Sequence, residues 1–142
     1  MQINCKLDEG TELPVCATEG SACVDLRATQ SHVIYPGTCT LIKTGFHVAI
    51  PKNHAGLVCS RSGLALKKQL FVLNAPGIID SDYRGDVSVI LMNAGTTPER
   101  IEKGDRVAQL MIIPARKMEF VPVEDLDNTE RGDGGFGHTG QK

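Results

Sequence analysis

The chain has 142 residues, a formal net charge of −2 and an apolar content of 41%, with no tryptophan. This length and composition predict one domain with an aliphatic core. The charge balance excludes a general nucleic-acid binder, which needs a basic surface to neutralise phosphates. No apolar run reaches 18 residues and the N-terminus lacks a signal-peptide core. We therefore expect no membrane interaction and no secretion, but a cytoplasmic location, or a nuclear one in a eukaryotic host.

Five cysteines and four histidines are present, without the spacing of a disulfide framework or a zinc site. We expect free thiols in a reducing compartment. The sequence also lacks a P-loop, a Rossmann glycine motif, and the H-E-x-x-H and G-x-S-x-G motifs. These absences argue against zinc catalysis, dinucleotide chemistry and Ser-His-Asp hydrolysis.

Short apolar stretches separated by turn residues predict β-strands through most of the chain. The stretches cover residues 33–35, 46–50, 87–92 and 107–113, with Phe120, Val121 and Val123 following, and the turn markers are Gly45, Gly77, Gly85, Gly95 and Gly104. Their spacing is typical of a β-sandwich or barrel, and strands that are apolar on both faces predict cover on both sides.

Two segments differ from this β pattern. Residues 62–68 combine a leading serine with good helix formers and two final lysines, which predicts a short helix that depends on tertiary packing. Residues 131–140 contain five glycines, too many to form a core, and predict a mobile tail. We divide the chain into a β domain at 1–125 and a flexible C-terminal arm at 126–142.

Two polar clusters interrupt the first half of the chain. Asp25 lies between two apolar residues, so its carboxylate needs either an arginine partner or a cation such as hydrated magnesium. Ser60, Arg61, Ser62 and Gly63 lie at the start of the predicted helix. A serine here serves either as a simple helix cap or, beside the arginine, as part of an anion site.

The next two clusters lie around predicted turns. In residues 74–85, two apolar positions lead to Asp80 and Asp82, and Tyr83 follows; the segment is either a polar β-turn or a loop that presents a carboxylate and a ring together. Gln109 is a single amide among apolar residues and needs a hydrogen-bond partner. Nearby, Asp105 and Arg106 fit structural roles better than functional ones.

The fifth cluster is in the glycine-rich tail. Arg131, Phe136 and Thr139 supply a cation, a ring and a hydroxyl at spacings that suit a lid over a nucleotide. By composition alone the same segment is a disordered end. Both interpretations stay open at this level.

Taken in chain order, these five clusters closely resemble the five motifs of the trimeric dUTPases, over residues 20 to 140. The resemblance implies a jelly-roll-like β-barrel that assembles as a homotrimer. It also implies that three active sites lie at subunit interfaces, each completed by the C-terminal arm of another subunit. The implied activity is Mg²⁺-dependent hydrolysis of dUTP to dUMP and pyrophosphate, and the implied partners include neither nucleic acid nor membrane.

The resemblance also implies roles for the hairpin of residues 74–88. Asp80 is similar to the general base that activates water for in-line attack on the α-phosphorus. Tyr83 resembles the residue whose ring lies against the deoxyribose and excludes a 2′-hydroxyl. Asn74, with Gly77 and Ser88 of the same hairpin, resembles the element that recognises uracil.

Phosphate and metal contacts are implied in the same way. Arg61, Ser62 and Gly63 resemble the phosphate-binding motif, with Ser62 near the bridging oxygen, and Gln109 resembles a further phosphate contact. Asp25 resembles the carboxylate that holds Mg²⁺ through water.

In the arm, Arg131 and Thr139 resemble phosphate ligands of the family. Phe136 resembles the ring that stacks on uracil, and the resemblance implies that Gly137 lies beside it in the substrate site. The five glycines of the tail then let the arm open to admit substrate and close to exclude water.

One residue departs from the family pattern: Cys23 occupies a position of the first motif that is usually glycine. Two rival functions remain. A dCTP deaminase, which shares the fold, carries a catalytic glutamate where this chain has Ile90 and a serine where it has Gly63, so the chemistry disfavours it. The second rival is a dUTP-binding protein that regulates a partner.

Overall fold

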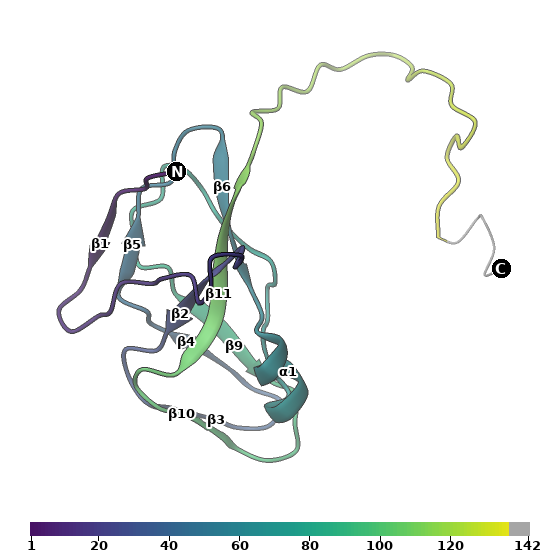
Figure 1. The fold of residues 1–142 in the computed structure, drawn as a ribbon. Coiled ribbons are helices and arrows are strands. Elements are labelled where there is room, and N and C mark those ends of the chain that lie inside the picture. The colour runs from purple at the N-terminus through teal and green to yellow at the C-terminus, as the bar shows by residue number, and fades with distance from the viewer. Residues whose placement is uncertain (137–142) are drawn as a thin grey trace.

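The computed structural model of the protein describes residues 1–136, which form strands and one short helix (Figure 1). The prediction of an all-β protein with a single short helix is confirmed for this part of the chain. The strands are β1 (Cys5–Leu7), β2 (Val24–Arg27), β3 (His32–Ile34), β4 (Cys39–Ile42), β5 (Phe46–Val48), β6 (His54–Cys59), β7 (Leu70–Val72), β8 (Gly77–Ile79), β9 (Val89–Asn93), β10 (Glu99–Ile101) and β11 (Arg106–Pro114), and the helix is α1 (Ser62–Lys68).

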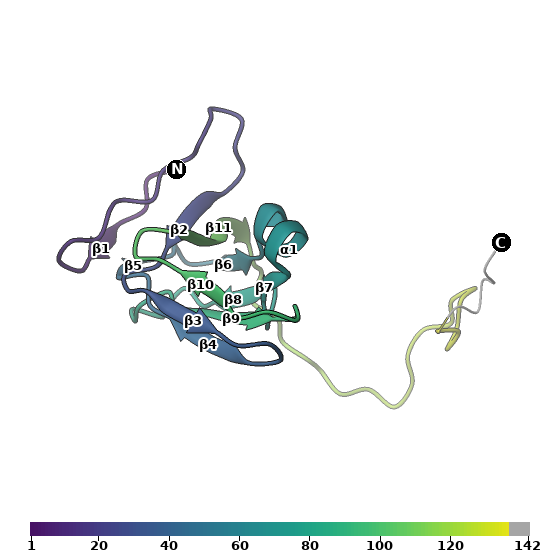
Figure 2. The ribbon, with the colours of Figure 1, turned by 90° about the horizontal axis from the view of Figure 1, so that it is seen from below.

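The strands form antiparallel sheets around the long strand β11. β11 pairs with β2 on one side and β6 on the other, and β8 extends the sheet beyond β6. A second sheet has the order β4-β9-β7, and two pairs, β1-β5 and β3-β10, complete the body. Figure 2 shows β2 and β11 on one side of the body and β3, β4 and β9 on the other. One aliphatic core between them contains Leu26 and Val58 as well as Ile42 and Leu91.

Strand β9 shows how the sequence sets this packing. Its burial alternates, so that Val89, Leu91 and Asn93 are buried while the residues between them are partly exposed. The amide of Asn93 donates to the carbonyls of Ile34 and Thr97, both at 2.8 Å, which satisfies a polar group in the core. Gly77, expected in a turn, instead opens β8 opposite Val58 on β6.

Helix α1 depends on tertiary contacts, as its length predicts. It ends at Gln69, whose left-handed backbone (φ 54°) lets its N–H bond to the last turn. Leu64 packs against the core, whereas Leu66 is 84% exposed. A serine cap, one of the two roles that the sequence left open, is absent: Arg61 is the N-cap and makes no side-chain cap hydrogen bond.

Residues 115–136 form no helix or strand and lead away from the body in Figures 1 and 2. Phe120 is 87% exposed, and Val121 and Val123 are also exposed, because no strand of the described chain covers them. The predicted boundary between residues 125 and 126 lies inside this segment and stays a prediction. Within the described residues, no helix has the length and apolar character needed to cross a membrane.

Candidate active site

Strand β11 brings three of the five polar clusters together. Gln109, near its middle, lies opposite Asp25 on β2 and opposite Cys59 at the end of β6. Facing residues of neighbouring strands share a face of the sheet, so these side chains lie side by side. Ser60 and Arg61 follow β6 directly and lead into α1, which places the second cluster beside the first. The Gln109 amide donates to the Ser60 carbonyl at 3.1 Å and so has the partner it needs.

The carboxylate of Asp25 is held by two arginines. Arg61 Nε donates to its Oδ1 at 2.9 Å, and Arg106 Nη1 donates to its Oδ2 at 3.2 Å. Arg61 also donates through Nη1 to the Arg106 carbonyl at 3.1 Å. The arginine partner expected for Asp25 is therefore present. Arg106, which the sequence favoured as structural, belongs to the candidate site.

These residues line a polar pocket of about 460 Å³, which we call the arginine pocket. Two guanidinium groups face a single carboxylate there, so the pocket has an excess positive charge that suits an anionic ligand. A Cβ added at Gly63 meets no atom within 4 Å, so packing within the chain does not require glycine at this position. The lining residues are Ala17, Ser21, Ala22, Cys23, Asp25, Arg61, Ser62, Gly63, Arg106 and Gln109.

Ser60 and Ser62 do not act as the helix caps that the sequence allowed. The hydroxyl of Ser60 accepts the backbone N–H of Val72 at 2.9 Å, which ties the start of the helix to β7. The first N–H groups of a helix have no partner within it, and Ser62 and Gly63 at this end line the arginine pocket. The local geometry therefore favours the anion-site interpretation.

The third cluster forms a separate site in residues 74–88, which the sequence predicts as a hairpin. That prediction is wrong in one respect: β8 pairs with β6, and β9 pairs with β4 and β7, so residues 80–88 are a loop between two sheets. The name hairpin is kept below for residues 74–88. Strand β8 ends at Ile79, so Asp80 is presented at its tip with an exposed side chain. The Tyr83 N–H donates to the Asp80 carbonyl at 3.2 Å, and the Tyr83 hydroxyl donates to the Asp86 carbonyl at 3.1 Å. A Cβ at Gly85 would lie 2.2 Å from the Tyr83 oxygen, so only glycine leaves room for this ring.

A second pocket, of about 190 Å³, lies on this hairpin, and we call it the hairpin pocket. It is lined by Ile78, Ile79, Asp80, Tyr83, Asp86 and Ser88. Asn74 lies against the start of β8, where a Cβ at Gly77 would meet its amide nitrogen at 3.3 Å. Of the residues that the sequence assigned to this segment, Asp80, Tyr83 and Ser88 line the hairpin pocket, whereas Asn74 and Gly77 do not.

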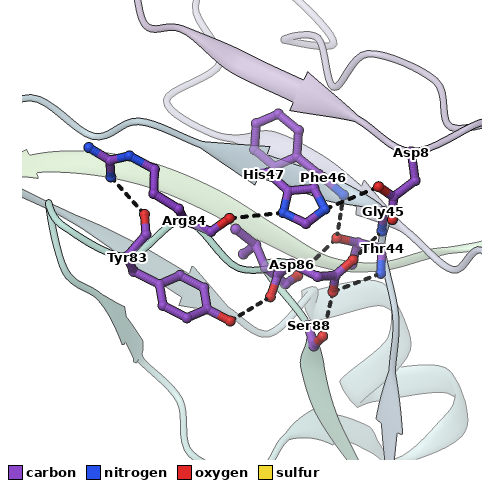
Figure 3. A network of polar contacts seen from close by, with 10 residues as sticks. Asp8, Thr44, Gly45, Phe46, His47, Tyr83, Arg84, Asp86 and Ser88 are labelled. Carbon is purple, nitrogen blue, oxygen red and sulfur yellow. Dashed lines mark hydrogen bonds and ion pairs between the residues drawn. The ribbon is translucent and has the colours of Figure 1, made fainter.

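The hairpin is anchored mainly by Asp8, Thr44, His47 and Asp86, to which the sequence assigned no role (Figure 3). The Asp86 carboxylate accepts the backbone N–H of Gly45 at 2.5 Å and that of Thr44 at 3.4 Å, and it also accepts the Ser88 hydroxyl. His47 lies between the Arg84 carbonyl and the carboxylate of Asp8. The only sequence feature that could have indicated this anchor is the position of Asp86, a carboxylate directly before a predicted apolar strand.

A single chain does not unite all five clusters. Among residues 1–136, none lines both the arginine pocket and the hairpin pocket. Arg131 and Phe136 are exposed on the segment that leaves the body, where Arg131 Nε donates to the Gly134 carbonyl at 2.9 Å. The predicted arm residues Gly137 and Thr139 lie outside the described residues.

Asp25 fits a water-mediated metal site better than a direct one, because both of its oxygens already accept arginine N–H groups. Mg²⁺ keeps several waters and is commonly held by one or two carboxylates together with substrate phosphates. In the described chain, one group of three side chains lies close enough to hold a metal directly: Asp8, His47 and Asp86. That group belongs to the hairpin anchor and not to the arginine pocket.

Cys23 is half-buried in the wall of the arginine pocket. Burial raises the pKa of its thiol, and the neighbouring Cys59, Cys16 and Asp25 raise that pKa further. All five cysteines are free, as their spacing predicts. The departure from the family pattern thus places a neutral thiol, and not a charge, beside Asp25.

Ile90 bears on the deaminase alternative. It lies on β9 opposite Leu41 of β4, and its aliphatic side chain is unable to carry a proton. The described fold therefore offers no acid or base at this position.

An antiparallel β fold with a cationic polar pocket and a separate carboxylate-bearing hairpin defines a protein that handles phosphate-containing ligands. A comparison with protein families identifies which family of this class the chain belongs to. The dUTPase family model matches residues 9–140. The chain belongs to the dUTPase family.

Similar proteins cover nearly the whole chain. The deoxyuridine 5′-triphosphate nucleotidohydrolase of Anaeromyxobacter sp. (strain Fw109-5) is 48% identical over 92% of this chain and 88% of its own length. That of Chlamydia muridarum is 46% identical over 99% of both chains.

Solved structures show the same fold. A mutant dUTPase of Staphylococcus bacteriophage 80alpha with dUpNHpp has a TM-score of 0.92 and 28% identity, and covers 98% of each chain. A mutant dUTPase from phage phi11 of S. aureus, whose structure describes the coordination of a structural Mg(II) ion, has a TM-score of 0.82 at 25% identity. It covers 88% of this chain and 98% of its own.

Proposed function

We propose that the protein hydrolyses dUTP to dUMP and pyrophosphate, with Asp80 as the general base for in-line attack of water on the α-phosphorus. The observation that carries this proposal is the position of Asp80 at the tip of β8, beside Tyr83, in a chain that also forms a cationic pocket. The named relatives support dUTP as the substrate.

Asp80 is suited to activate water. Its exposed side chain forms no ion pair or side-chain hydrogen bond within residues 1–136, unlike Asp25 and Asp86. An ionised carboxylate without competing donors is free to accept a proton from a positioned water. The Tyr83 ring next to it offers an apolar face to the sugar.

The arginine pocket supplies the phosphate site in this proposal. Arg61, with Ser62 and the first N–H groups of α1, binds phosphate oxygens, and Gln109 adds an amide. When bound, Mg²⁺ would neutralise charge on the triphosphate. Asp25 would hold the hydrated ion through water, and the Arg61 and Arg106 contacts fix the orientation of its carboxylate.

The hairpin supplies recognition of the base. Asn74 and the backbone near Gly77 lie against each other and offer hydrogen-bonding groups that match the edge of uracil. Ser88 lines the adjoining hairpin pocket. Donors and acceptors arranged for uracil leave cytosine mismatched, because its amino group replaces a carbonyl. The restricted space also disfavours the methyl group of thymine.

A homotrimer with shared sites completes the proposal. The two pockets of one chain share no described lining residue, so a partner subunit that places its hairpin beside the arginine pocket of the first supplies the missing half. The arm residues Arg131, Phe136, Gly137 and Thr139 then close over a bound nucleotide of another subunit.

The test is pyrophosphate release from dUTP by the wild type and by Asp80→Asn, with dCTP and dTTP as controls and with EDTA added in a parallel series. We expect turnover of dUTP alone, its loss with EDTA, and a fall in kcat of about 10²- to 10⁴-fold in the variant. A wild type that binds dUTP without turnover overturns the proposal and favours the regulatory alternative.

A further inference from the structure

The turn that carries Asp80 and Tyr83 has few ties to the rest of the protein. Residues 81–85 belong to no strand. Arg84 Nη1 donates to the carbonyls of Ser81 and Tyr83, both at 2.8 Å, but these bonds stay within the turn. In the part of the chain described, the contact of Arg84 with His47 is the one hydrogen bond from residues 81–85 to an element outside the hairpin.

The base of the hairpin, by contrast, is firmly docked. Thr44 is buried and donates its hydroxyl to the Val87 carbonyl at 2.9 Å, while the Val87 N–H donates to the Phe46 carbonyl at 2.8 Å. Asp86 adds its bonds to the N–H groups of Thr44 and Gly45. The position of the base is therefore set by residues 44–46, and His47, next in sequence, extends this contact toward the tip.

The ring of His47 has acceptors on both sides (Figure 3). Its Nδ1 lies 3.0 Å from the Arg84 carbonyl oxygen, and its Nε2 lies 3.2 Å from a carboxylate oxygen of Asp8. A carbonyl oxygen accepts but never donates, so the Arg84 contact requires a proton on Nδ1. Asp8 is an exposed carboxylate (54% for the side chain) that is free to turn toward water when Nε2 carries no proton.

We infer that His47 is a positioning residue for the hairpin: its Nδ1–H, donated to the Arg84 carbonyl, fixes the turn that presents Asp80 and Tyr83. This inference rests on the proposed dUTP hydrolysis, because it assigns the contact a role in that reaction. His47 touches neither pocket, since it lines neither the arginine pocket nor the hairpin pocket. It acts through Arg84, which directly follows Tyr83 in the chain.

The two ring nitrogens allow a matched pair of substitutions. An asparagine amide nitrogen occupies nearly the position of Nδ1, so His47→Asn keeps a donor for Arg84 and loses the one for Asp8. A glutamine amide nitrogen reaches nearly the position of Nε2, so His47→Gln keeps the donor for Asp8 and loses the one for Arg84. His54→Gln is the control, because within residues 1–136 the one hydrogen bond of the His54 ring goes to the carbonyl of Lys52, two residues away.

The experiment measures kcat and KM for dUTP in all three variants, together with amide hydrogen exchange of residues 81–88 without substrate. We expect His47→Gln to lower kcat about tenfold, because a small displacement of a catalytic group is costly. His47→Asn and His54→Gln should stay within about twofold of the wild type. Exchange at residues 81–88 should accelerate in His47→Gln alone.

The inference is overturned if His47→Gln keeps the wild-type kcat, if it keeps the wild-type exchange rates, or if the Asn and Gln variants lose activity equally. The last result would mean that the ring serves general packing and not one directed bond. If the wild type fails to hydrolyse dUTP, the proposed function fails, and exchange in the same two variants still decides whether the Nδ1 contact holds the turn.

Discussion

At the scale of single residues, the most informative group is Arg61. Its Nε and Nη1 atoms point to different acceptors, the Asp25 carboxylate and the Arg106 carbonyl. A planar guanidinium makes such divergent contacts in a fixed geometry, whereas a lysine ammonium acts as a single point charge. The role of Arg61 therefore depends on its shape as well as on its charge.

We expect Arg61→Lys to raise KM for dUTP by about tenfold or more, because one or both of its charge-assisted hydrogen bonds are lost. Steady-state kinetics measure this change. Arg116→Lys is the matched control, since Arg116 is exposed and lines neither pocket, and it should behave as the wild type. A lysine variant at position 61 with unchanged KM would show that charge alone is sufficient.

The Cys23 thiol gives a second prediction at this scale. Its raised pKa leaves less thiolate at a given pH, and the thiolate is the form that reacts with iodoacetamide. We expect Cys23 to be alkylated more slowly near neutral pH than the exposed Cys5 and Cys39, with a rate that increases as the pH rises toward its raised pKa. Peptide mass spectrometry over a pH series measures the three rates. Faster labelling of Cys23 near neutral pH contradicts the assignment.

The local sequence shows which side chains need a polar partner, but it does not show which distant residue supplies that partner. Asp25, set among apolar residues, requires an arginine or a cation, but nothing near it shows that Arg61 and Arg106 meet it. The bond between His47 and Arg84 joins residues 37 positions apart, and neither residue stands out in its own segment. Long-range pairs of this kind depend on strand register, which the pattern of one segment does not determine.

At the scale of elements, β9 is central to the second sheet, between β4 and β7. Leu91 in the middle of this strand is fully buried. We expect Leu91→Ala to lower the free energy of unfolding by about 2–5 kcal/mol, through lost apolar burial and the cavity left behind. Denaturant unfolding followed by circular dichroism measures this change.

Leu66→Ala is the matched control for that measurement, because Leu66 has the same side chain but lies exposed on α1. Alanine is also a good helix former, so the substitution does not weaken the helix. Its effect should stay within about 0.5 kcal/mol in the isolated chain. A loss at position 91 no larger than at position 66 would contradict the central place of β9 in the core.

In this chain the hydrophobic pattern predicts which segments form strands or a helix. The residues at which these elements begin and end depend on tertiary contacts instead. The apolar run at 107–113 correctly predicts β11, and the helix formers after Ser62 correctly predict α1. The expected strand at 87–92 begins later, at Val89, because the Val87 N–H is taken by the Phe46 carbonyl and Ser88 turns back to Asp86. Of the two roles that the sequence left open for the serines, helix capping is not observed, because Arg61 is the N-cap and the Ser60 hydroxyl accepts from Val72 of β7.

At the scale of the whole molecule, the chain has the features of an incomplete unit. Phe120 and Leu126 are almost fully exposed on the segment that leads away from the body (Figure 1). The arginine pocket and the hairpin pocket have no lining residue in common. Exposed apolar residues and a divided site both fit a protein whose partner is another copy of itself.

Shared sites predict that two inactive variants restore activity when their subunits mix. Arg61→Gln damages the arginine pocket, and Asp80→Asn damages the hairpin. If each site draws its pocket from one subunit and its hairpin from another, random mixing in equal amounts leaves both halves intact in about a quarter of the sites. We therefore expect co-refolded mixtures to recover about a quarter of the wild-type rate of pyrophosphate release, whereas each variant alone stays inactive.

A mixture of Asp80→Asn with Tyr83→Ala is the control for this experiment. Both substitutions lie on the hairpin, so every hairpin in the mixture carries one defect, and no arrangement of subunits yields an intact site. Capture of one variant through an affinity tag, with detection of the untagged variant bound to it, checks that mixed oligomers form in each sample. Recovery in the hairpin–hairpin control, or none in the pocket–hairpin mixture despite oligomer formation, would show that one chain builds its own complete site.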